Sequence, residues 1–194
     1  MSQRNRTIFA GEWHAWVSVF VYTLILYSTL TLAFNLYVRV YDQVGRETVS
    51  FWMNAGFVVV GVPLILFALV VYRPGPSGLA ALLLIGMTVA LCLDQLAVPA
   101  KRFHFFQYAP LTVLVFDALR FRCRDRGIYV WAMLLVSLIG LGDETIQWLL
   151  PDRYFGVVDV VINSVAGLLT LTFIGFVMGE ENYPLPNRKR SAPL

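Results

Sequence analysis

This chain has few charged residues: Asp, Glu, Lys and Arg together make up 14% of its 194 residues. Soluble domains carry roughly a quarter charged residues, so the composition excludes an ordinary soluble domain. Cysteine is also rare: Cys92 and Cys123 fall at different predicted membrane depths, which excludes a disulfide framework and a cysteine-rich metal site. The sequence has no Ser or Cys nucleophile motif and no glycine-rich phosphate loop, which argues against hydrolases and nucleotide-dependent enzymes.

Hydrophobic residues are abundant instead, at 58% of the chain, and they form long runs. A helix needs about 20 apolar residues to cross roughly 30 Å of hydrocarbon, and lipid offers no partners to an unpaired backbone. We therefore predict an all-α fold, a polytopic transmembrane helix bundle of about six spans. The predicted spans are residues 16–38, 51–72, 78–98, 103–121, 128–150 and 157–178.

The segments between the runs are rich in charge, glycine or proline, as helix ends and turns require. They read RVYDQVGRET, RPGPS, PAKR, RCRDRG and PDRYFG. The first run is longer than the apolar core of a signal peptide, so it predicts a retained helix. Residues 180–194 lack apolar periodicity and predict a disordered cytoplasmic tail.

The distribution of lysine and arginine predicts the orientation, because cytoplasmic loops carry the excess of these residues. The more basic side collects Arg4, Arg6, Arg73, Arg120, Arg122, Arg124, Arg126, Arg188, Lys189 and Arg190, and the other side Arg39, Arg46, Lys101, Arg102 and Arg153. The chain is therefore expected in a bacterial inner membrane, with both termini on the cytoplasmic side. Topology accounts for the net charge of +3, so no nucleic-acid partner is expected.

Ionisable residues inside membrane spans are costly and are read as functional by default. In this chain they gather at the outer ends of the last four predicted spans, at spacings of three or four residues that place them on shared helical faces. The spacing predicts a binding site on the outer side of the membrane. Its predicted members are Lys101, His104, Tyr108, Asp143, Glu144, Gln147, Arg153, Asp159 and Asn163.

Three stretches, KRFHFFQY, GDETIQ and PDRYFGVVDVVINSVAG, resemble the VanZ-like family in order and spacing. The resemblance runs from Lys101 to Gly167, about a third of the chain, and departs from the family where Ala100 replaces an aspartate. It implies a two-helix N-terminal segment (1–77) added to a four-helix VanZ-like core (78–179). It also implies a cell-envelope role associated with resistance to glycopeptides such as teicoplanin, without a settled biochemical activity.

Several chemistries fit the predicted cluster. Arginine and lysine suit an anionic headgroup, either of a lipid-linked molecule or of a cell-wall precursor. His104 and Glu144 form a titrating pair that an acid–base enzyme would need, although no catalytic residue is assigned. A metal is not expected, because one histidine without a tight ligand motif is a poor signature, and no cofactor is expected either.

Two further readings stay open. Lys101, Arg102 and Arg153 could neutralise the acidic residues in a network that only holds the helices together. Alternatively, the chain is a non-catalytic accessory or assembly subunit that docks a membrane protein through its first two helices.

Overall fold

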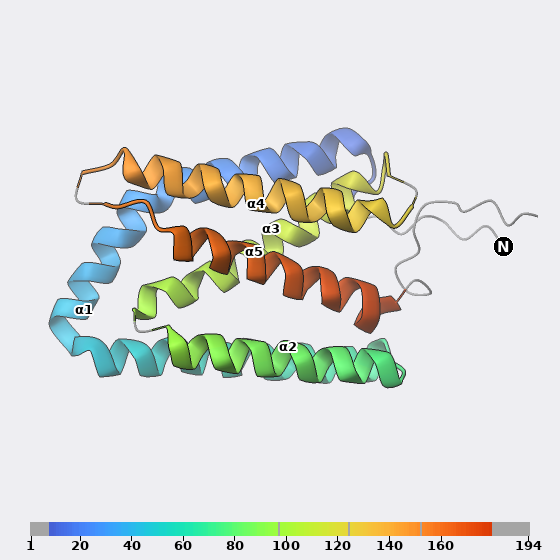
Figure 1. Ribbon diagram of the computed structural model, residues 1–194, viewed down its shortest axis with the longest axis horizontal. Coiled ribbons are helices and arrows are strands. Elements are labelled where there is room, and N and C mark those ends of the chain that lie inside the picture. The colour runs from blue at the N-terminus through green and yellow to red at the C-terminus, as the bar shows by residue number, and fades with distance from the viewer. Residues whose placement is uncertain (1–7, 97, 124, 152, 180–194) are drawn as a thin grey trace, which may run out of the picture.

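The computed structural model describes residues 8–96, 98–123, 125–151 and 153–179, and within these ranges the regular structure is helical. The elements are α1 (Glu12–Val71), α2 (Pro76–Gln95), the short 3₁₀ helix η1 (Pro99–Arg102), α3 (Phe103–Leu119), α4 (Gly127–Trp148) and α5 (Val157–Thr172), which continues into a π-helical turn, η2 (Phe173–Met178). Figure 1 shows the helices running along the long axis of the molecule, so the connections collect at its two ends.

Four of the helical segments are long and apolar enough to cross a membrane: α1, α2, α4 and the combined segment Val157–Met178. The chain is therefore a helical membrane protein, as its composition predicts. At 17 residues, α3 is shorter than these four segments.

The break between helices that the sequence predicts at residues 39–48 is a single non-helical residue in the structure. Helix α1 continues through this charged segment, and only Gly45 has non-helical dihedral angles, with φ 78° and ψ 167°. Glycine adopts a positive φ without steric cost, whereas the Cβ of every neighbouring residue disfavours this conformation. Figure 1 shows that α1 changes direction at one end of the molecule, where its colour turns from blue to cyan. Its first part, before Gly45, and its second part, after Gly45, therefore run in opposite directions.

Helix α3 lies at the centre of the bundle, packed against α4, α5 and the first part of α1. Its buried face includes Leu111, Val115 and Phe116, none of which is exposed. Small residues allow the close approach of α4 and α5: a Cβ on Gly140 would lie 3.0 Å from the Cβ of Asn163. Such small-residue contacts replace the hydrophobic effect, which does not drive helix association inside lipid.

The first part of α1 belongs to this core. The Tyr22 hydroxyl donates a hydrogen bond to the carbonyl of Gln107 (2.9 Å), and the Tyr27 hydroxyl donates to that of Ile139 (2.6 Å). Helix α2 lies at the edge, where Ala81 packs with Ala68 of α1 and Val177 of η2. In the 18-residue apolar stretch of each helix, 11% of the residues are buried in α2 and 39% in Val157–Met178. Helix α2 therefore presents most of its surface to the surroundings.

Candidate functional site

All nine predicted site residues lie at one end of the bundle, where the connections α2–α3 and α4–α5 meet (Figure 1). Lys101 comes from η1, and His104 and Tyr108 come from the first turns of α3. The last turns of α4 and the connection after it supply four residues, and the first turns of α5 supply two. In chain order these six are Asp143, Glu144, Gln147, Arg153, Asp159 and Asn163.

Gln147 is the hub of the hydrogen bonds on α4. Its side-chain nitrogen donates to Asp143 Oδ1 (3.3 Å) and Glu144 Oε1 (3.2 Å), as spacings of four and three residues along a helix allow. Arg153 donates to the oxygen of the same amide, and Tyr108 donates its hydroxyl to Asp143 Oδ2 (3.0 Å). One chain of hydrogen bonds thus joins α3, α4 and the connection that follows α4.

A second set of contacts ties the start of α5 to the cluster. Lys101 Nζ lies 2.8 Å and 2.9 Å from the two oxygens of Asp159, and the backbone N–H of Gly156 donates to Glu144 Oε2 (3.0 Å). The Lys101 side chain is 29% exposed, whereas Glu144 is completely buried. The site therefore has a basic rim that a ligand can reach and an acidic floor.

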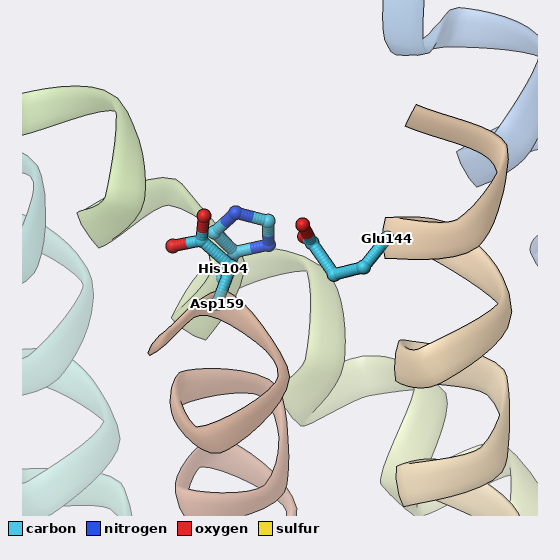
Figure 2. Close-up of side chains that lie close together, drawn as sticks. All are labelled: His104, Glu144 and Asp159. Carbon is cyan, nitrogen blue, oxygen red and sulfur yellow. The ribbon is translucent and has the colours of Figure 1, made fainter. Parts of the chain in front are cut away.

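Two side chains of the cluster hold buried polar atoms that no described residue bonds. They are His104, through Nδ1, and Asn163, through both Oδ1 and Nδ2. Buried polar atoms almost always have a hydrogen-bond partner, so each of these atoms can take a further hydrogen bond. His104 also lies between Glu144 and Asp159, as Figure 2 shows.

Arg102 bonds groups other than the acidic residues with which the network interpretation paired it. It is 7% exposed and donates to Asn54 Oδ1 (2.9 Å) and to the carbonyl of Leu96 (3.1 Å), so it ties the second part of α1 to the turn after α2. The reason is geometric. Successive residues of a 3₁₀ helix point about 120° apart, and here Lys101 faces Asp159 whereas Arg102 faces Asn54 in the second part of α1.

A second polar group lies at the opposite end of α3, outside the site predicted from the sequence. Asp117 and Arg120 are 0% and 1% exposed, and Arg120 Nη1 lies 3.3 Å from Asp117 Oδ1. The backbone N–H of Ile8 donates to Asp117 Oδ2 (3.0 Å). The sequence places Arg120 in a row of loop arginines that indicates the cytoplasmic side, whereas in the structure it lies in a buried ion pair. An aspartate three residues before it, inside a predicted span, was the available signal.

The fold and the cluster define a helical membrane protein with a polar site at one end of its bundle. No protein-family model, curated protein or solved structure matches the chain.

Enlarging Gly140 should separate α4 from α5 beneath the site. Gly140→Val places a branched side chain where even a Cβ would lie 3.2 Å from Asn163 Nδ2 and 3.4 Å from Tyr108 Cε1. Overpacking of this kind costs about 1–3 kcal/mol, so we expect a lower melting temperature in detergent. Gly86→Val in α2 is the matched control, since nothing lies within 4 Å of a Cβ there. Equal melting of the two variants would mean that α4 and α5 are not in close contact at Gly140.

Proposed function

We propose that this chain is a VanZ-like protein of a bacterial inner membrane whose outer-face site binds the anionic headgroup of a lipid-linked or wall-precursor molecule. Through that ligand it would influence susceptibility to glycopeptides such as teicoplanin. One observation carries the proposal: Lys101, a partly exposed cation, stands at the rim of a buried acidic cluster in which His104 and Asn163 keep unpartnered polar atoms among the described residues.

The proposal includes six membrane crossings with both termini in the cytoplasm. The bend at Gly45 divides α1 into two crossings, and α2, α3, α4 and the segment Val157–Met178 supply the others. The connections that hold Lys101 and Arg153 then share the outer side. The connection after α3, with its row of arginines, lies at the opposite end (Figure 1), which the excess of basic residues favours as cytoplasmic.

Labelling of single cysteines tests this orientation in a background in which Cys92 and Cys123 are replaced by serine. Tyr154 is 87% exposed, so a Tyr154→Cys protein should react with a membrane-impermeant thiol reagent in cells with an accessible inner membrane. Asp125→Cys, an exposed position at the other end, should react only after the membrane is opened. The reverse pattern would put the site on the cytoplasmic face and end the wall-precursor proposal.

The contacts of the cluster suit a phosphate-bearing headgroup. Lys101 is a mobile point charge that can exchange the carboxylate of Asp159 for a phosphate oxygen. The Arg153 guanidinium is held at 4.3 Å over the ring of Phe34, which keeps its planar fork oriented for bidentate binding. The carboxylates of Asp143 and Glu144, which Gln147 orients, then offer acceptors for hydroxyl groups of a sugar.

Binding of a fluorescent polyprenyl diphosphate to the protein in lipid nanodiscs tests the headgroup directly. A charge-assisted hydrogen bond contributes about 1.5–3 kcal/mol, so Lys101→Met should weaken binding by about 10–100-fold. Arg122→Met is the control, because Arg122 is an exposed base that bonds Glu12 at the opposite end of the bundle. Equal loss in both variants would show non-specific attraction of the anion, and no loss in either would remove Lys101 from the site.

The exposed surfaces of α2 and of the second part of α1 favour a second candidate, an accessory or assembly subunit of a larger membrane complex. Leu83 and Val70 are each 70% exposed on these two helices. A photo-crosslinking residue at either position would capture one recurrent protein if this candidate is right. Crosslinks to lipid alone would favour the headgroup proposal.

A further inference from the structure

Three potential metal ligands converge within the cluster from three different helices. One donor atom each of His104, Glu144 and Asp159 lie within 4.8 Å of one another. Figure 2 shows the imidazole of His104 between the two carboxylates, with Glu144 reaching it from α4 and Asp159 from α5. Donors on a tetrahedral metal, with bonds of about 2.0–2.2 Å, lie about 3.4 Å apart, so small rotations of these side chains bring them to bonding distance.

The environment of the three side chains is the kind that orients metal ligands. The buried Nδ1 of His104 has no hydrogen-bond partner among the described residues. Glu144 is held by the backbone N–H of Gly156 on one oxygen and by Gln147 on the other. Hydrogen bonds from outer groups fix the direction of ligating carboxylates and tune their basicity in the same way.

We propose that His104, Glu144 and Asp159 bind one divalent transition-metal ion. An imidazole and two carboxylates form a mixed set of nitrogen and oxygen ligands. This set suits Zn²⁺ or Mn²⁺ better than it suits Ca²⁺ or Mg²⁺, which prefer oxygen ligands alone. Three protein ligands leave a coordination position for water or for an anionic ligand. The inference goes beyond the proposed function, because the ion needs no headgroup in order to bind.

The ion pair between Lys101 and Asp159 makes a specific demand on such a site. Lys101 bonds both oxygens of Asp159, so it competes with a metal ion for the lone pairs of this carboxylate. The ammonium group also repels an incoming cation. Removing Lys101 should therefore tighten metal binding, whereas it should weaken the binding of a phosphate headgroup. The Lys101→Met variant therefore tests the headgroup proposal and the metal proposal separately.

Titration with Zn²⁺ against a chromophoric chelator tests the site in chelator-stripped, full-length protein in nanodiscs. The wild type should bind one Zn²⁺ per chain with a Kd below about 1 μM. His104→Ala, Glu144→Gln and Asp159→Asn should each weaken binding by more than about 100-fold, the upper end of the loss when an outer-shell partner is removed. Lys101→Met should tighten binding. Asp94→Asn is the control, because Asp94 is an exposed carboxylate bonded by Gln95.

X-ray absorption at the zinc edge identifies the ligand atoms in the wild-type protein, so it tests the proposal even if a variant fails to fold. We expect nitrogen and oxygen ligands at about 2.0–2.2 Å, one of them an imidazole, and no sulfur. A sulfur ligand would assign the ion to Cys92 or Cys123 and overturn the proposal. Wild-type protein that binds no stoichiometric Zn²⁺, or a loss in Asp94→Asn equal to that in the ligand variants, would overturn it as well.

Discussion

Replacing Asp117 by alanine should lower the free energy of unfolding by about 3–5 kcal/mol, the usual cost of removing one member of a buried ion pair. Asp117 and Arg120 are almost completely buried, and the pair lies next to the segment that begins at Ile8. The variant leaves the Arg120 guanidinium without this carboxylate and frees the Ile8 N–H from it. Thermal unfolding in detergent, followed by circular dichroism, measures the loss.

An exposed ion pair at the same end of the bundle provides the control. Arg122 bonds Glu12, and their side chains are 74% and 36% exposed. Exposed pairs of this kind contribute about 0–1 kcal/mol, so Glu12→Ala should melt close to the wild type. In the double variant Asp117→Ala/Arg120→Met, which removes both charges, much of the lost stability should return. Asp117→Ala melting like Glu12→Ala would contradict the burial of the pair.

Glu144→Gln should abolish the binding of the headgroup and of the metal ion while the protein still inserts at normal levels. The substitution keeps the size of the side chain and removes a charge that is expensive to bury. The amide can still accept the N–H of Gly156, but its nitrogen then faces the nitrogen of Gln147, so we expect a stability cost of only about 1 kcal/mol. Both proposed ligands lose a carboxylate of α4 that lies within 4.8 Å of the donor atom of His104.

Teicoplanin susceptibility, measured in cells that carry the variant and normalised to protein abundance in the membrane, checks this expectation. The Glu144→Gln strain should behave like a strain without the gene. Thr145→Ala is the matched control, because Thr145 is the next residue, is exposed and bonds the backbone of its own helix at Leu141. A Glu144→Gln strain with normal abundance and an undiminished phenotype would leave this carboxylate a purely structural role.

Local spacing in the sequence accounts for a large share of the fold and of the cluster. The apolar runs predict the helices, and the intervals from Asp143 and Glu144 to Gln147 predict contacts along one helix face. The ion pair of Lys101 with Asp159 spans 58 positions of the chain, so it depends on how α3 and α5 pack. The same holds for His104, whose partners come from two other helices. The expectation of no metal rested on the lack of a local ligand motif.

Other differences come from backbone geometry rather than from composition. The charged segment 39–48 was predicted to separate two helices, but α1 continues through it. Charged side chains do not end a helix, and one glycine, Gly45, is enough for the bend. Arg102 follows Lys101 directly, and which of the two faces the cluster depends on how the 3₁₀ helix Pro99–Arg102 packs against α1 and α5. Arg120 was grouped with its exposed neighbours because sequence alone does not show that α3 ends inside the bundle.

Mass spectrometry of the lipids that remain bound to gently purified protein tests the central claim most directly. The wild type should carry a phosphate-bearing polyprenyl lipid, or a wall precursor built on one, well above its proportion in the membrane. Lys101→Met and Glu144→Gln proteins, purified in parallel and folded by their melting curves, should carry it at background level. Only bulk phospholipids, in equal amounts on all three proteins, would contradict an outer-face headgroup site.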